Sequence, residues 1–354
     1  MTTTSKRVLA LAGAGMLAVA LAGTTTAAAG TDLTRAVDGL DGPRGLDIAH
    51  GRTVVAESDG SITEIIRRGP DKGTTQRIGK VPGGFGSAVA VGKHGDVWAL
   101  TGGEEGTLYL FQDGKRRKAV VDVAKAQRKN PDPYDLEDKP KESNAFGLAA
   151  MPDGTVLVAD AANNSVIHVT RSGKVTLVAR VKTRVVEMPE GFDDPQLPPP
   201  GTPMPTEAVV TSVAVGPDGE VYLGELRGFP GTPETSQIWR VEPGATGAVC
   251  KPNKPNKGAC TLEADGLTSI VALDTGRGGA LYVAELSKMG WLAAEFNVPG
   301  AEVGAIIRLG HDRNVRRELS PGKAILPGGV AVASGGSVFM SGPVFGPGSV
   351  TKVG

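Results

Sequence analysis

Acidic residues close four short apolar segments of this sequence. Glu57 follows TVVA, Asp160 follows VLVA, Glu225 follows VYLG and Glu285 follows LYVA. Carboxylate oxygens that converge on one place can hold calcium, which takes about six to eight oxygen ligands. Alternatively, a carboxylate at a strand end accepts backbone N–H groups and fixes its own loop. Both interpretations stay open at this point, and calcium is the only candidate cofactor.

Asp47 is a fifth candidate for such a metal site. It lies in the segment GLDIA, and the corresponding segments elsewhere carry an alanine at its position: Ala90, Ala149, Ala214, Ala272 and Ala331. Because burial of an unpaired charge is costly, Asp47 must either pair with another group, contact water in the central channel, or form part of a binding site.

Sequence motifs of common enzymes are absent. The chain has no G-x-S-x-G, H-E-x-x-H, C-x-x-C or P-loop motif. Its histidines are scattered and predict no base beside a nucleophile: His50, His94, His168 and His311. We therefore assign no catalytic residue. A metal-dependent or lactonase-like hydrolase that uses the acidic residues above remains an alternative.

The acidic residues belong to a repeated unit that occurs six times. AFGLAAMPDGTVLVAD (145–160) and VTSVAVGPDGEVYLGE (210–225) are near-copies of its first half. Each copy has a short apolar run, a turn with glycine, and a second run rich in β-branched and aromatic residues, which is typical of strands. Repeats of about 40–50 residues with four strands are typical of β-propellers. The sequence therefore predicts an all-β, six-bladed propeller with four-stranded blades.

The ends of the chain predict how the ring closes. The last repeat stops after its third strand, and LTRAVDGL (33–40) resembles CTLEADGL (260–267), the fourth-strand segment before the fifth repeat. The N-terminal segment is therefore expected to supply the outer strand of the last blade. Residues 30–354 then form a single domain.

Four long insertions are expected on one face of the propeller. They span residues 125–143, 187–208, 226–236 and 286–302, and they join either the fourth strand to the next blade or the second strand to the third. Loops on a rigid scaffold commonly carry binding groups. Phe229, Trp291 and Phe296 are the candidate contact residues on this face. The alternative is that these rings pack onto their own blades.

The first 29 residues have the pattern of a secretory signal peptide. Lys6 and Arg7 precede the apolar run VLALAGAGMLAVALAG, and an Ala-rich segment follows, with cleavage expected near Ala29–Gly30. We therefore expect a secreted protein with no transmembrane segment after cleavage.

The charge balance bears on which partners the protein binds, and the cysteine content bears on the redox compartment in which it folds. The chain has 38 basic and 38 acidic residues, which argues against nucleic acid because phosphate neutralisation drives that binding. Cys250 and Cys260 are the only cysteines and bracket a loop rich in Pro, Asn and Gly. In an exported chain this pattern predicts a disulfide.

VTSVAVGPDGEVYLGELRGFPGTPETSQIWRVEPG (210–244) resembles the exported bacterial ScyD/ScyE family, and AFGLAAMPDGTVLVADAANNSVIHV resembles NHL-type propeller repeats. GLTSIVALDTGRGGALYVAEL and PGGVAVASGGSVFMSG fit the same family, and GELRGFP is the most specific part. The resemblance covers the mature chain and implies a six-bladed fold and export. It supplies no activity that can be assigned to particular residues.

The sequence thus favours an exported, monomeric, non-enzymatic binding or accessory propeller. Its partner would be a protein or a small molecule on the insertion-bearing face. The hydrolase described above and an adhesive scaffold of the cell envelope are the two alternatives.

Overall fold

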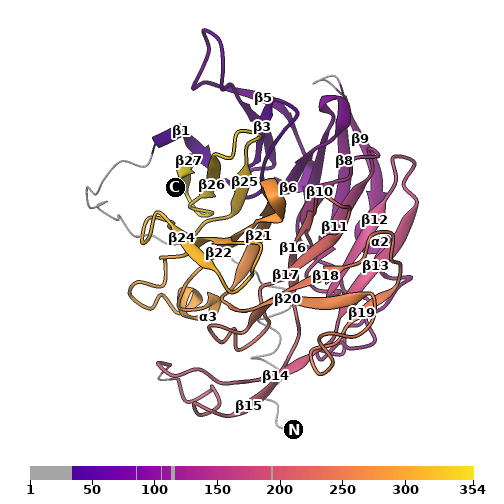
Figure 1. Cartoon of the computed structure of the whole chain (residues 1–354), viewed down its shortest axis with the longest axis vertical. Helices are drawn as coiled ribbons and strands as arrows, with labels where there is room; N and C mark the ends of the chain where they lie inside the picture. The colour runs from indigo at the N-terminus through magenta and orange to yellow at the C-terminus, as the bar shows by residue number, and fades with distance from the viewer. Residues whose placement is uncertain (1–33, 85, 105, 113–115, 193) are drawn as a thin grey trace.

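The computed structural model describes residues 34–354 except for positions 85, 105, 113–115 and 193. Its strands form six small antiparallel sheets arranged in a ring, and the chain passes around this ring once, as the colours of Figure 1 show. The predicted six-bladed propeller with four-stranded blades is confirmed. The expected signal peptide lies outside the described residues.

The first three blades follow the chain from the inner strand outward. Blade 1 contains β2 (Leu46–Ala49), β3 (Arg52–Ala56), β4 (Ser61–Ile65) and β5 (Thr75–Lys80). Blade 2 contains β6 (Gly86–Val91), β7 (Val97–Thr101), β8 (Thr107–Gln112) and β9 (Arg116–Asp122). Blade 3 contains β10 (Ala145–Ala150), β11 (Val156–Asp160), β12 (Ser165–Val169) and β13 (Val175–Val181).

The remaining blades repeat the pattern, and the last one is completed by the start of the described chain. Blade 4 contains β16 (Val210–Val215), β17 (Val221–Glu225), β18 (Ser236–Val241) and β20 (Cys260–Leu267). Blade 5 contains β21 (Ile270–Thr275), β22 (Leu281–Glu285), β23 (Ala305–Leu309) and β24 (Arg316–Leu319). Blade 6 contains β25 (Gly329–Val332), β26 (Val338–Gly342), β27 (Pro347–Val353) and β1 (Thr34–Asp41).

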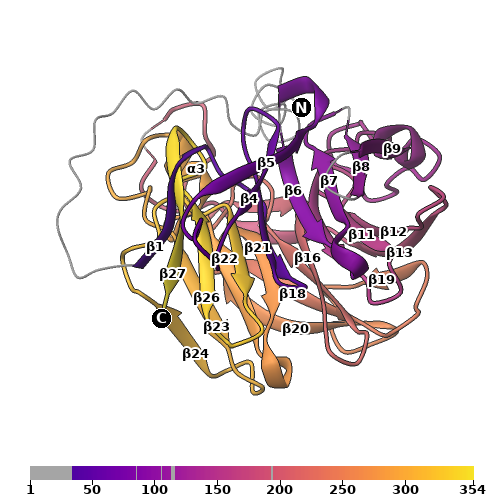
Figure 2. The ribbon, with the colours of Figure 1, turned by 90° about the horizontal axis from the view of Figure 1, so that it is seen from above.

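The pairing of β1 with β27 closes the ring as the sequence predicts. The two strands are antiparallel, with Thr34 opposite Lys352 and Asp41 opposite Pro347, and Figure 2 shows them side by side. Leu40 of β1 is buried with Leu46 and Val350 in one core cluster. The N-terminal strand therefore supplies both a hydrogen-bonded edge and core packing.

The core consists of layers between adjacent blades. Middle strands such as β7 and β11 are buried along their whole length, because a neighbouring blade covers each face of their sheet. This explains why their sequences are continuous apolar runs rather than alternating ones. At some positions of the inner strands the next blade comes so close that only glycine fits. A Cβ atom on Gly147 would lie 2.5 Å from the Thr211 carbonyl oxygen of the next blade.

Additional elements extend from the ring. They are the hairpin of β14 (Arg184–Glu187) and β15 (Pro203–Thr206), the short strand β19 (Ala248–Cys250), the short helices α2 (Val123–Gln127) and α3 (Trp291–Glu295), and 3-10 turns at Pro82–Gly84, Lys93–Gly95 and Arg277–Gly279. Among the described residues, no helix has the length and apolar character that a membrane span requires.

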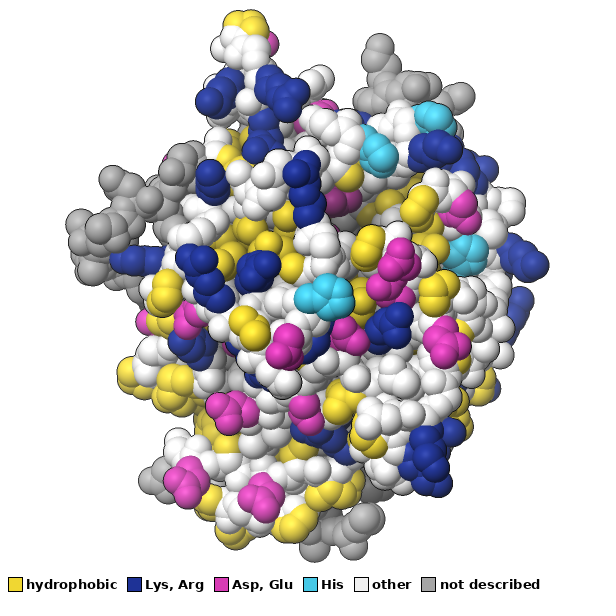
Figure 3. All heavy atoms as spheres, viewed as in Figure 1, with side chains coloured by type: hydrophobic (Ala, Val, Ile, Leu, Met, Phe, Trp, Pro, Cys, Tyr) yellow, Lys and Arg dark blue, Asp and Glu magenta, His cyan; other side chains and the backbone are white. Residues whose placement is uncertain are grey.

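The two faces of the propeller differ. One face carries tight turns, such as the β2–β3 and β10–β11 connections, and the long β18–β20 connection of blade 4; we call it the tight-turn face. The other carries the long connections between second and third strands and between successive blades, so we call it the insertion face. Figure 3 views the tight-turn face, where histidines and charges of both signs are interspersed.

Candidate functional site

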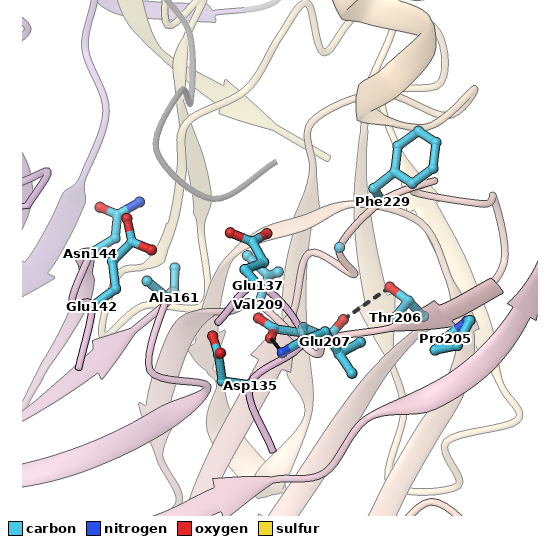
Figure 4. A pocket seen from close by; sticks show the side chains of 13 residues that line it. Asp135, Glu137, Glu142, Asn144, Ala161, Pro205, Thr206, Glu207, Val209 and Phe229 are labelled. Atoms are coloured by element: carbon cyan, nitrogen blue, oxygen red, sulfur yellow. Dashed lines mark hydrogen bonds between the residues drawn. The ribbon is translucent and has the colours of Figure 1, made fainter. Parts of the chain in front are cut away.

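A pocket on the insertion face gathers carboxylates from two insertions. Asp135, Glu137 and Glu142 come from the connection between blades 2 and 3, and Glu207 comes from the connection between blades 3 and 4. We call this site the carboxylate pocket. It encloses a cavity of about 30 Å³, which is room for one small group. Figure 4 shows Asp135, Glu137 and Glu207 close to one another, with Glu142 and Asn144 on one side and Phe229 at the far end.

A buried network folds the first insertion onto blade 3. The Asp132 carboxylate lies 3.5 Å from Arg180 Nε. The same guanidinium donates hydrogen bonds to the carbonyls of Asn130 and Pro131 at 2.9 and 3.1 Å. Asp132 also accepts a 3.0 Å hydrogen bond from the Asn164 side chain. Buried polar groups that are fully paired rigidify a structure, so this network fixes the backbone that carries the pocket acids.

Glu207 ties the two insertions together. Its Oε1 accepts a 2.7 Å hydrogen bond from the Leu136 backbone N–H, and its Oε2 accepts one of 3.1 Å from Asn164 Nδ2. The Asn164 carbonyl Oδ1 in turn accepts the Val209 backbone N–H at 2.7 Å. Glu207 is therefore held rigidly at the floor of the pocket.

Glu137 has no such partner. Its carboxylate makes no hydrogen bond or ion pair with any described residue, while Glu142 lies 3.5 Å from Lys139 Nζ. Burial, with repulsion from Glu142 and Asp135, raises the pKa of Glu137 to about 7. Burial raises the pKa of Glu207 to about 7 as well. Carboxyls with raised pKa values in a pocket make it a candidate functional site, because a nearby cation would favour their ionised forms.

A second network fixes the third insertion and connects it to the second. Glu225 and Arg227 form an ion pair whose side chains are both fully buried. Glu225 also accepts a 2.6 Å hydrogen bond from Trp239 Nε1. Arg227 Nη1 donates to the Glu207 carbonyl at 3.3 Å, which connects this ion pair to the floor of the carboxylate pocket. Arg227 is thus a positioning residue in the segment GELRGFP.

The aromatic residues predicted for the binding face are placed unequally. Phe229 and Trp291 are 8% and 7% exposed and belong to one core cluster. The Trp291 indole N–H donates a 2.8 Å hydrogen bond to the Arg227 carbonyl. These two rings pack against the blades, in agreement with the alternative interpretation of the sequence, in which the aromatic residues are part of the core. Phe296 is 45% exposed and forms an edge-to-face contact with Phe192, with ring centroids 5.6 Å apart.

The acids that close the second strands are engaged within the fold. Glu57 accepts the Asp41 backbone N–H at 2.8 Å, and Glu285 accepts that of Thr268 at 2.8 Å. Asp160 accepts the Asn144 backbone N–H at 2.8 Å and the Ser143 hydroxyl at 2.6 Å. With the ion pair of Glu225, these bonds match the structural interpretation of the acids.

Asp47 has a counterpart that the sequence comparison missed. Asp47 pairs with Val54, and the residue at the equivalent place in blade 5 is Asp274, which pairs with Tyr282. Our alignment placed Ala272 there, two residues too early, because IVAL (270–273) resembles the SVAV of blade 4 (212–215), whereas the strand pairing aligns Asp274 with Ala214. Each aspartate accepts a 2.6 Å hydrogen bond from the next blade, from the N–H of Val91 and of Val332 respectively.

Both aspartates line an axial cavity of about 370 Å³, together with apolar side chains of the inner strands and with His50, Lys93 and Thr275. Burial and the nearby Asp47 raise the pKa of Asp274 to about 7, and burial raises the pKa of Asp47. No three His, Cys, Asp or Glu side chains within the described ranges converge closely enough to hold a metal ion.

The sequence located the insertion face but not the pocket acids. Glu137 and Glu207 lie inside the segments 125–143 and 187–208. Neither belongs to the repeat, so periodicity gave them no distinctive signal. Their convergence depends on Asn164 and Arg180, which are ordinary blade residues in the sequence.

Fold and site together define a six-bladed β-propeller with a carboxylate pocket on its insertion face. No family model and no curated protein sequence matches the chain. Among solved structures, the PQQ-bound aldose sugar dehydrogenase from Streptomyces coelicolor matches with a TM-score of 0.56 and 14% identity, over 92% of this chain and 98% of that one. A gluconolactonase from Xanthomonas campestris matches with a TM-score of 0.57 and 11% identity, over 91% and 89%.

A Bacteroides thetaiotaomicron protein of unknown function is equally similar, with a TM-score of 0.56, 10% identity and coverage of 91% and 73%. At these identities the likeness shows the fold alone, because one fold hosts many functions.

Proposed function

We propose that this chain is a non-enzymatic binding propeller and that the carboxylate pocket binds an ammonium or guanidinium group of its ligand. The observation that carries the proposal is the unpaired Glu137 carboxylate beside Asp135, Glu142 and Glu207. Like charges this close oppose each other's ionisation, and an inserted cation relieves that repulsion. The cavity of about 30 Å³ suits one such group and excludes a large ligand from its interior.

The test is a titration of the full chain with methylguanidine, followed by calorimetry. Glu137→Gln should weaken binding about tenfold to hundredfold, because a hydrogen bond to a charged group is worth about 1.5–3 kcal/mol. Glu242→Gln, which changes an exposed carboxylate beyond β18 on the tight-turn face, is the matched control and should bind like the wild type. Absence of binding by the wild type, or equal affinity of Glu137→Gln, would refute the proposal.

A lactonase-like hydrolase is the second candidate. It is supported by the fold shared with a gluconolactonase and by the pKa values of about 7 for Glu137 and Glu207, which suit general acid–base catalysis near neutral pH. Hydrolysis of gluconolactone that is lost in Glu137→Gln would favour this candidate. Tight stoichiometric calcium binding would favour its metal-dependent form, and capture of an envelope protein would favour the scaffold.

We further propose that the protein is exported as a monomer and belongs to the ScyD/ScyE family. The disulfide between Cys250 and Cys260 supports export, because such bonds persist in oxidising compartments. The motif GELRGFP supports the family assignment. Its Glu225 and Arg227 form a buried ion pair, which explains why the fold needs these two residue types in the motif. N-terminal sequencing of secreted protein should give a start near Gly30, and a retained Lys6 would overturn export.

A further inference from the structure

A second, apolar pocket lies on the insertion face between blades 5 and 6. Its cavity has a volume of about 120 Å³, and its walls are chiefly Leu286, Trp291, Ala294, Val298, Leu326 and Phe345. The α3 insertion supplies most of the wall, the connection to blade 6 supplies Leu326, and the β26–β27 connection supplies Phe345. None of these residues belongs to the carboxylate pocket.

The walls of this pocket are held in place from several sides. The backbone N–H of Trp291 donates to the Ser269 hydroxyl at 2.9 Å, and its indole N–H donates to the Arg227 carbonyl at 2.8 Å. The Leu326 N–H donates to the Glu302 carbonyl at 2.9 Å, and the Val344 N–H donates to the Leu326 carbonyl at 3.1 Å. The pocket is therefore preformed, which lowers the cost of binding.

Glu295, the last residue of α3, also lines this cavity. Its carboxylate makes no hydrogen bond or ion pair with any described residue. Burial alone raises its pKa, to about 7. A carboxylate beside apolar walls without a partner is unfavourable, and a bound cation would compensate for it.

The size of the cavity limits the ligand. An apolar protein cavity of about 150 Å³ holds one benzene molecule, so a cavity of about 120 Å³ has room for one small ring or a short aliphatic chain. The Trp291 ring also suits a cation, because aromatic faces attract positive charge, whereas the Phe345 ring already has the Arg44 guanidinium 5.6 Å from its centroid.

We propose that this apolar pocket binds a small primary amine, whose ring or chain fills the cavity and whose ammonium group pairs with Glu295. The proposal is independent of the carboxylate pocket, since the two sites share no lining residue.

The experiment compares benzylamine with benzyl alcohol, a neutral molecule of nearly the same shape, by calorimetric titration of the full chain. Benzylamine should bind about tenfold more tightly than the alcohol, because only the amine pairs with the carboxylate. Glu295→Gln should remove this preference and leave the affinity for the alcohol unchanged. Glu242→Gln is the matched control and should retain the preference.

A cavity-filling variant, Ala294→Leu, tests the location. It should weaken the binding of both molecules about tenfold, because the larger side chain occupies the space of the ring. A thermal melt of each variant verifies that it is folded. Equal affinity of the wild type for the two molecules, or a preference that survives Glu295→Gln, would overturn the proposal. Benzylamine binding that Ala294→Leu leaves unchanged would overturn it as well.

Discussion

Two aspartates stand where the inner strands of the other blades have alanine. Asp47 and Asp274 each accept a backbone N–H from the next blade, at Val91 and Val332. These bonds link blade 1 to blade 2 and blade 5 to blade 6 near the axis. The same positions bring the two acids into one axial cavity. Each N–H bond favours the ionised form of its acid, whereas burial opposes ionisation, and for Asp274 the nearby Asp47 opposes it as well.

At the residue scale, Asp274→Asn is expected to stabilise the protein at alkaline pH. The folded-state pKa of about 7 lies above the ordinary value of 3.8. The contribution of this group to stability is therefore fully present below pH 3.8 and is lost as the pH rises through about 7. Asparagine stays neutral and retains an oxygen for the Val332 N–H. The gain should reach up to about 4 kcal/mol at pH 8 and vanish near pH 4.

Urea unfolding of both proteins between pH 4 and pH 8 measures this difference. Asp71→Asn, which changes an exposed loop residue, is the control and should follow the wild type. If the wild type and Asp274→Asn lose stability equally as the pH rises, the assignment of the buried charge to Asp274 is wrong.

One short strand adds backbone hydrogen bonds between two adjacent blades. β19, which lies in the β18–β20 connection of blade 4, pairs in parallel with β13 of blade 3. Its last residue, Cys250, forms the predicted disulfide with Cys260, the first residue of β20. The bond therefore anchors a fifth strand of blade 3 to the outer strand of blade 4.

At the element scale, the variant Cys250→Ser/Cys260→Ser should loosen this connection. The chain-entropy model gives a loss of about 3 kcal/mol for a loop of this length. Hydrogen exchange should accelerate at Gly247 and Lys182, whose amides donate to Leu177 and Cys250, before it accelerates elsewhere. Amides of β7 in the distant blade 2 are the internal control. Unchanged exchange at Gly247 would mean that packing alone holds β19.

The elements of the repeat were predictable because each carries a strong local signal. Runs such as VLVAD and VYLGE, followed by a turn with glycine, indicate buried strands. β19 has only three residues, and β15 reads PMPT, so neither resembles a strand in sequence. Their pairing partners, β13 and β14, decide their conformation.

The candidate sites were predictable only in part. The insertions marked the face, and Phe296 is exposed there, while its role in binding stays a prediction. The burial of Trp291, however, depends on the Arg227 carbonyl, and the place of Glu207 depends on Asn164 and Leu136. These are long-range hydrogen bonds that local sequence patterns do not encode.

The whole molecule is a ring whose closure involves the two ends of the described chain. β1 contributes Leu40 to the core and pairs along its length with β27. A further closing contact is the hydrogen bond from the Ser341 hydroxyl to the Arg44 carbonyl at 2.5 Å. Without β1, the edge of β27 would be exposed to water and to other chains.

Deletion of residues 31–40 should therefore lower the melting temperature strongly. The milder Leu40→Ala should cost about 2–5 kcal/mol, because Leu40 is only 4% exposed. Asp41→Asn, an exposed change in the same strand, is the control and should have little effect. Differential scanning calorimetry compares the three variants with the wild type. An unchanged melting temperature after the deletion would mean that the ring does not depend on β1.

Closure by β1 also has a consequence for the order of events during synthesis. Thr34 and Lys352 are partners in the finished sheet, yet β27 is synthesised long after β1. Contacts between residues so far apart in the chain form slowly. Until β27 has been made, β1 remains an unpaired strand and the five preceding blades form an open arc. The earliest segment of the sheet is thus the last to dock, and the protein becomes a ring in a single late step.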